Sequence, residues 1–191
     1  MKKSDERYLL LHQKNSSMND ENIFLEESTV GTTAEASYEP DYETERNKPM
    51  PSLNHGALQM QLGASLFLKY ANQFKIVSEV KLALPSVKPA VPDISIFPKM
   101  PVDWLNDEIQ VTEPPLTVIE ILSPKQSIDD IKNKIFDIYF PGGVKSAWLV
   151  IPTVQSIHIF SPDRTFKTYT SGKLIDPVTG IELDMDKVFS N

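Results

Sequence analysis

The stretch TVIEILSPK, residues 117–125, contains the most apolar strand that the sequence predicts. Apart from Glu120, residues 117–122 are β-branched or apolar, a pattern typical of a strand buried on both faces of a sheet. Ser123 and Pro124 then end the strand. Glu120 is therefore expected inside the core, where a lone carboxylate is costly and needs a partner or a chemical role.

The chain around this strand is predicted to form an α/β domain with a mixed central sheet. One helix is predicted over 56–73, capped by Ser52 or Asn54, and a second amphipathic helix over 127–140. The predicted strands are 75–84, 92–97, 116–122 and 146–151, followed by a hairpin of 155–161 and 165–170.

The first fifty residues differ from the rest in charge. Residues 1–50 hold eleven acidic and six basic residues, a net charge of −5, whereas residues 51–191 have a net charge of −2. We expect 1–50 to be an acidic, partly irregular arm and 51–191 to be the folded domain. Apolar residues 23–25 of the arm need covering, so a homodimer formed through the arm is one prediction.

Composition excludes several classes of protein. No apolar run is long enough to cross a bilayer, so no membrane association is expected. The absence of cysteine excludes disulfides and thiolate metal sites, and fits a cytoplasmic location. The folded domain is not basic, so strong nonspecific affinity for DNA is not expected.

Three acidic residues from different predicted strands could meet on one face of the sheet. Strand periodicity places Glu120 with Val118, Asp93 with Phe97, and Glu79 with Val77. If the three strands are neighbours, Asp93 and Glu120 converge, with Glu79 near them. Converging buried carboxylates favour a divalent cation, Mg²⁺ or Mn²⁺, which in such a site can activate water against a phosphodiester.

The second helix supplies candidate cations. Lys132 and Lys134 border the isoleucine stripe of 128–139 on opposite sides. A lysine in such a place can lay its stem on the core and bring its ammonium group to a strand end. There it would orient water or stabilise developing negative charge.

These residues resemble a known family. Pro92-Asp93, the run from Glu120 to Pro124, Lys134, Tyr139 and the segment 143–150 together are similar to the Uma family of "putative restriction endonucleases", long catalogued as a domain of unknown function. The resemblance covers roughly residues 50–190. It implies a restriction-endonuclease-like core of the PD-(D/E)XK superfamily, with Asp93 and Glu120 as metal ligands, nucleic acid, in particular DNA, as substrate, and His55 and Glu79 as additional site residues.

The sequence departs from the family pattern at two points. The superfamily lysine two residues after the acidic residue is replaced by Leu122, so the helix must supply the lysine. In the family, that lysine lies four residues before the tyrosine, but Lys134 lies five before Tyr139. Lys134 is the preferred catalytic lysine, and Lys132 is the runner-up.

The sequence also allows purely structural roles for the same residues. Asp93 could shape a turn, and Glu120 could be a buried structural carboxylate paired with Lys81 or a backbone amide. Glu79 could pair with Lys81, and His55 could serve the start of the helix. The alternative function is accordingly a noncatalytic protein of nuclease fold that binds nucleic acid or a protein partner.

Overall fold

A computed structural model of the chain describes residues 50–190, and the structural statements below refer to this part. These residues lie within one compact unit, Glu39–Asn191. The predicted acidic arm of 1–50 falls almost entirely outside the described residues, so the arm and its boundary remain predictions. No helix within residues 50–190 is long and apolar enough to span a bilayer.

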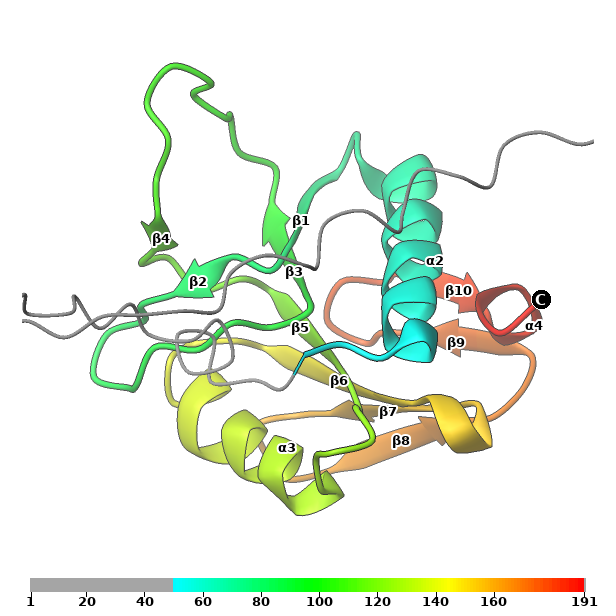
Figure 1. Ribbon diagram of the computed structural model, residues 1–191. Helices are drawn as coiled ribbons and strands as arrows, with labels where there is room; N and C mark the ends of the chain where they lie inside the picture. The colour runs from blue at the N-terminus through cyan, green and yellow to red at the C-terminus, as the bar shows by residue number, and fades with distance from the viewer. Residues whose placement is uncertain (1–49, 191) are drawn as a thin grey trace, which may run out of the picture. The chain divides into compact units, whose positions relative to one another are not determined.

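A mixed six-stranded sheet forms the centre of the domain, as predicted (Figure 1). Its strand order is β1-β3-β5-β6-β7-β8, and only β5 and β6 pair in parallel. β7 and β8 are the predicted hairpin. The strands are β1 Phe74–Ser78, β3 Ile94–Pro98, β5 Thr117–Ile121, β6 Ser146–Ile151, β7 Ser156–Phe160 and β8 Phe166–Tyr169.

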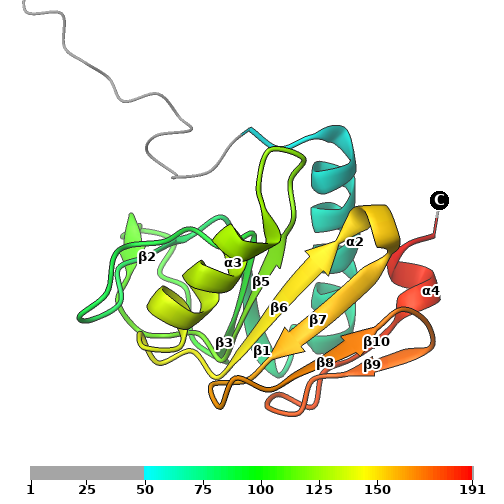
Figure 2. The same cartoon turned by 90° about the horizontal axis from the view of Figure 1, so that it is seen from below.

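Helices cover both faces of this sheet (Figure 2). α2, Leu53–Tyr70, packs the leucines of its inner side on the cluster that includes Ile119 and Trp148. α3, Ile128–Lys134, continues into the π-helical segment η1, Ile135–Tyr139, and packs on the cluster that includes Val118 and Leu149. Because successive strand residues alternate between these two clusters, β5 is buried on both faces, as its sequence predicts.

Shorter elements complete the fold. A parallel pair forms from β2, Lys81–Leu82, and β4, Gln110–Val111. β9, Lys173–Ile175, and β10, Glu182–Asp184, form an antiparallel hairpin, followed by α4, Met185–Val188. The short 3-10 helix η2, Pro152–Val154, joins β6 to β7.

Two sequence-based boundaries are wrong. The predicted strand 75–84 ends at Ser78, because Glu79 adopts a left-handed conformation with φ of 58° and β2 then joins a different sheet. Glu79 therefore does not share a strand face with Val77. The first helix begins at Leu53 rather than at residue 56, with Ser52 as the N-cap whose hydroxyl accepts from the backbone N–H of His55.

One buried carboxylate that the sequence did not single out fixes the C-terminal hairpin to the sheet. Asp176 is fully buried, and its Oδ2 accepts from the indole N–H of Trp148 at 2.8 Å and from the hydroxyl of Thr117 at 3.1 Å. Its Oδ1 accepts from the backbone N–H of Val178 at 2.8 Å. Asp176 is a structural residue, because these hydrogen-bond partners come from the strands and the turn that it joins.

Removing this carboxylate is expected to destabilise the domain. Asp176→Ala leaves the buried indole N–H of Trp148 without its acceptor and should lower the free energy of unfolding by about 3 kcal/mol. Asp176→Asn keeps an acceptor oxygen and should cost about 1 kcal/mol. Urea denaturation of the three proteins checks this order, and equal midpoints for Asp176→Ala and the wild type would contradict it.

Candidate active site

The pairing of β3 with β5 brings Asp93 and Glu120 together. Ile94, the first residue of β3, is paired with Ile119, so Asp93 directly precedes the paired part of β3 and Glu120 directly follows the paired part of β5. The exposed fractions of the two residues are 0% and 1%. The backbone N–H of Ile121 donates to Asp93 Oδ2 at 2.6 Å, which ties the two strands together at this point.

Glu120 is held by two side chains of the α3–η1 segment. Lys134 Nζ lies 2.7 Å from Glu120 Oε1, and the hydroxyl of Tyr139 donates a hydrogen bond to the same oxygen. Lys134 also donates to the carbonyl oxygen of Val91 at 3.3 Å. Burial raises the pKa of Tyr139 well above its ordinary value, and the negative charges of Glu120 and Asp93 and its hydrogen bond to Glu120 add to that increase. Tyr139 is therefore a neutral donor.

The π-helical turn explains the unusual spacing of the lysine and the tyrosine. In a π-helix the backbone N–H bonds to the carbonyl five residues earlier, as Phe140 does to Ile135 at 3.0 Å. Side chains five residues apart then lie on the same side of the helix. Lys134 and Tyr139 consequently reach one carboxylate oxygen, and the Lys134 ammonium lies 5.6 Å from the centre of the Tyr139 ring.

His55 positions Asp93 from the first turn of α2. His55 Nε2 lies 3.0 Å from Asp93 Oδ1, and Nδ1 lies 2.9 Å from the hydroxyl of Ser123. An ionised carboxylate only accepts, so Nε2 carries the proton that the Asp93 contact uses. The sequence predicted His55 near the site, but it did not identify Ser123 as its second partner, since the two residues lie 68 positions apart.

Glu79 lies beside this cluster and is linked to it through Gln59. The amide of Gln59 donates to Glu79 Oε1 at 3.0 Å and to the backbone carbonyl of Asp93 at 3.1 Å. The backbone N–H of Glu79 also approaches that carbonyl, at 3.3 Å. Glu79 thus contacts the Asp93 backbone, a position that follows from its left-handed conformation rather than from strand alternation.

The two candidate lysines have different positions. Lys132 pairs with Asp129 at 3.1 Å on the surface, where their exposed fractions are 44% and 80%. Lys134 is 15% exposed and reaches the buried carboxylate. Lys134 also lines a surface pocket of about 490 Å³ together with Lys88 and Asp137. The side of the cluster that carries Lys134 is thus connected to solvent.

The donor set of the cluster fits a hard divalent cation. Among residues 50–190, no three His, Asp or Glu side chains gather as a ready-made metal cage. Asp93 and Glu120 offer carboxylate oxygens, and an ionised carboxylate has about four lone-pair sites with which it can accept hydrogen bonds and bind a cation together. Mg²⁺ is commonly bound by one or two carboxylates, with waters and substrate oxygens completing its octahedron. The chemistry of this pair suits Mg²⁺ or Mn²⁺ better than a closed Zn²⁺ site.

Comparison with known proteins agrees with this architecture. The Uma2 family model, described as "Putative restriction endonuclease", matches residues 41–186. The chain is also similar to a solved structure described as "a putative nuclease belonging to DUF820" from Anabaena variabilis ATCC 29413, with 23% sequence identity and a TM-score of 0.63. That match covers 74% of this chain and 83% of the other, and it confirms the predicted fold. No curated protein sequence matches the chain.

Replacing each of the two lysines should show how much more the buried ion pair contributes to stability than the surface pair. Lys134→Ala leaves the Glu120 carboxylate buried without its cation and should lower the free energy of unfolding by about 3–5 kcal/mol. Lys132→Ala removes an exposed pair and should change it by less than about 1 kcal/mol. Guanidinium denaturation measures both values, and similar losses for the two variants would show that the pair of Lys134 and Glu120 is not the stronger constraint.

Proposed function

Because the chain belongs to the Uma2 family, we propose that it is a metal-dependent endonuclease that hydrolyses phosphodiester bonds in DNA. The observation that carries the proposal is that Asp93 lies at the start of β3 and is hydrogen-bonded to the backbone of β5 next to Glu120, with Lys134 2.7 Å from Glu120. Metal-assisted hydrolysis needs oxygen ligands for an ion and a nearby cation or proton carrier. These three side chains provide that combination within the buried cluster.

Each residue of the cluster has a proposed role. Asp93 and Glu120 would hold Mg²⁺ or Mn²⁺, and the bound ion would supply water activation and charge neutralisation. Lys134 would orient the attacking water or stabilise negative charge that develops on the phosphate. His55 and Tyr139 are positioning residues, because they contact Asp93 and Glu120 respectively. Glu79 would act through Gln59 and the Asp93 backbone.

The nuclease assignment is tested by cleavage. The purified full chain should cut plasmid or linear duplex DNA in Mg²⁺ or Mn²⁺ and be inactive with EDTA. Glu120→Gln, Asp93→Asn and Lys134→Met should each reduce the rate at least about 100-fold. Lys132→Met and Asp129→Asn are matched controls from the exposed pair on α3, and both should cut normally. Cleavage that survives Glu120→Gln would remove the assignment, and single-stranded DNA and RNA substrates tested in parallel decide the substrate class.

A noncatalytic role is the second candidate, and a specific feature favours it. Asp93 and Glu120 are buried and already bonded by protein donors, and Leu122 stands where the superfamily carries a lysine. In that case the polar cluster would only fix the fold of a protein that binds nucleic acid or another protein. Titration calorimetry separates the two functions.

Calorimetry is expected to detect binding of Mn²⁺ to the wild type and loss of that heat in the Asp93→Asn variant. Asn keeps the size of the side chain and removes its charge. Its oxygen can accept from Ile121, and its NH₂ group can donate to His55 Nε2 in the other neutral tautomer, so the variant should fold. Absence of metal binding to the wild type, combined with unchanged DNA binding by the variant, would favour the noncatalytic protein.

Assembly and location form part of the same proposal. The restriction-endonuclease likeness is compatible with a homodimer, and the cysteine-free composition with a cytoplasmic protein. Nucleic acid is the proposed partner in both candidate functions. The domain of residues 51–191 has a net charge of −2, so any DNA contact would have to be local, near the pocket that Lys88 and Lys134 line.

A further inference from the structure

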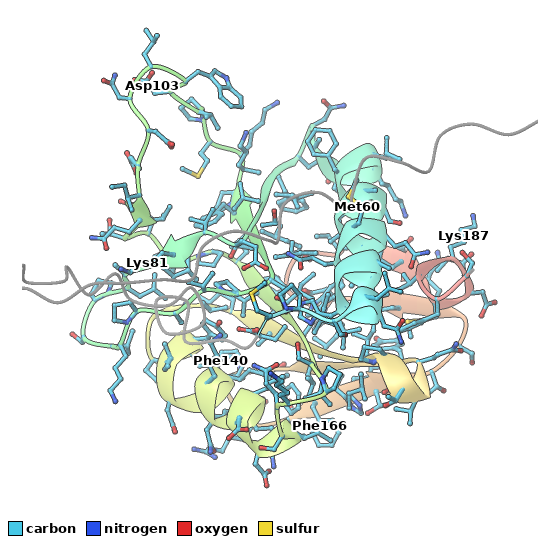
Figure 3. All side chains as sticks on the ribbon, in the orientation of Figure 1. Met60, Lys81, Asp103, Phe140, Phe166 and Lys187 are labelled. Atoms are coloured by element: carbon cyan, nitrogen blue, oxygen red, sulfur yellow. The ribbon has the colours of Figure 1, made fainter. Side chains whose placement is uncertain are left out.

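α2 is apolar on the side that it turns away from the sheet. Leu53, Met60, Phe67 and Leu68 are exposed by 86%, 73%, 58% and 85% of their surfaces, although they belong to an 18-residue helix whose opposite side is core. A surface helix normally carries polar residues on that side. Figure 3 marks Met60 on the helix. We call the side that carries these residues the outer face of α2.

The outer face continues into a groove beside an edge strand. A groove of about 620 Å³ lies between α2 and β1, and its walls include Met60 and Phe67 from the helix and Ile76 and Val77 from the strand. β1 is the last strand of the central sheet on this side. The apolar surface is therefore wider than the helix alone, and an apolar patch of this kind on a folded domain marks an interaction site.

Small residues separate the large ones on the outer face. Gly56 and Gly63 lie inside the helix, and a Cβ added to either would meet nothing within 4 Å. Neither glycine is therefore required by packing among residues 50–190, although glycine is less favourable than alanine in a helix. A glycine that such packing does not explain is consistent with a surface to which the backbone or a side chain of another molecule comes close.

The order of large and small residues is complementary to itself when two copies of the helix run antiparallel. If a second α2 lies antiparallel across the first and residue 62 is at the two-fold axis, residues whose numbers add to 124 stand opposite each other. Every large residue then faces a small one. The pairs are Leu68 with Gly56, Phe67 with Ala57, Met60 with Ala64 and Leu53 with Ala71. A parallel arrangement would instead oppose Phe67 to Phe67 and Gly56 to Gly56.

We propose that the outer face of α2 is the interface of a two-fold symmetric homodimer in which the two α2 helices pack antiparallel. A symmetric interface uses the same patch on both subunits, so self-complementarity is the property it requires. The outer face carries no charged side chain, which lets two copies of an acidic chain approach without repulsion there. The interface needs no residue of 1–50 and does not depend on the proposed nuclease activity.

The exposed apolar area of the outer face is large enough to form the centre of a protein interface. The four large exposed side chains offer on the order of 500 Å² of apolar surface per chain, against about 800 Å² per partner in a standard interface. The groove and the β1 edge would supply the rest. The helix pair is thus the centre of the interface rather than all of it.

Sedimentation equilibrium of the full chain over a range of concentrations tests the proposal by exchanging a large residue for a small one. The wild type should be a dimer. Ala57→Phe opposes two aromatic rings and Phe67→Ala leaves a hole, so each should raise the dimer Kd at least about tenfold. The double variant Ala57→Phe with Phe67→Ala restores one large and one small residue in each pair, and its Kd should return to within about threefold of the wild type.

Further variants serve as controls. Met60→Glu should abolish the dimer, whereas Leu105→Glu, at a residue 94% exposed in the loop before β4, should leave it intact. Gly56→Ala should raise the melting temperature of the dilute monomer, because alanine favours the helix, and yet raise the dimer Kd. A folding defect would lower the melting temperature, so it would not produce this combination. A wild type that is monomeric at all concentrations, or a double variant that stays dissociated, would overturn the proposal. Loss of the dimer in Leu105→Glu but not in Met60→Glu would assign the interface to the loop and overturn it as well.

Discussion

Burial of the Glu120 carboxylate inside the sheet is the constraint on which the arrangement of this domain depends. A buried carboxylate without partners would lose several kcal/mol relative to water, so the fold must bring donors to it. Lys134 and Tyr139 are those donors, and both come from the segment that covers this face of β5. The apolar contacts of Ile131 and Ile135 place the segment, and the π-helical turn sets the side-chain directions that the carboxylate requires.

The helix on the other face of the sheet also has two roles. Its inner leucines fill the core, and its first turn carries His55 to Asp93. The start of α2 is fixed by the Ser52 cap, so the position of His55 depends on a local hydrogen bond as well as on packing. The outer face is apolar but exposed in the part of the chain that the structure describes, and we therefore connect it with assembly rather than with folding.

The electrostatic character of the site is that of a low-dielectric cluster rather than of a basic surface. Two carboxylates, one ammonium group and a neutral phenol lie together with little exposure, so their mutual interactions are stronger than they would be in water. A divalent ion would lower the repulsion between the carboxylates further. The proposed chemistry on a phosphodiester would depend on this local cluster and not on the net charge of the chain, which is −7.

The sequence by itself determined the central strands and the amphipathic helices, because apolar periodicity and strand alternation are local properties of the chain. It predicted a convergence of Asp93 with Glu120 only on the condition that their strands are neighbours, and the pairing of β3 with β5 is a property of the tertiary structure. It did not determine the place of Glu79, whose left-handed backbone ends β1, or the choice of Lys134 over Lys132. Tertiary structure decided these. A π-helical turn and a buried carboxylate's partners depend on contacts between segments 14 to 43 residues apart, and their energies exceed the small local preferences that a sequence pattern records.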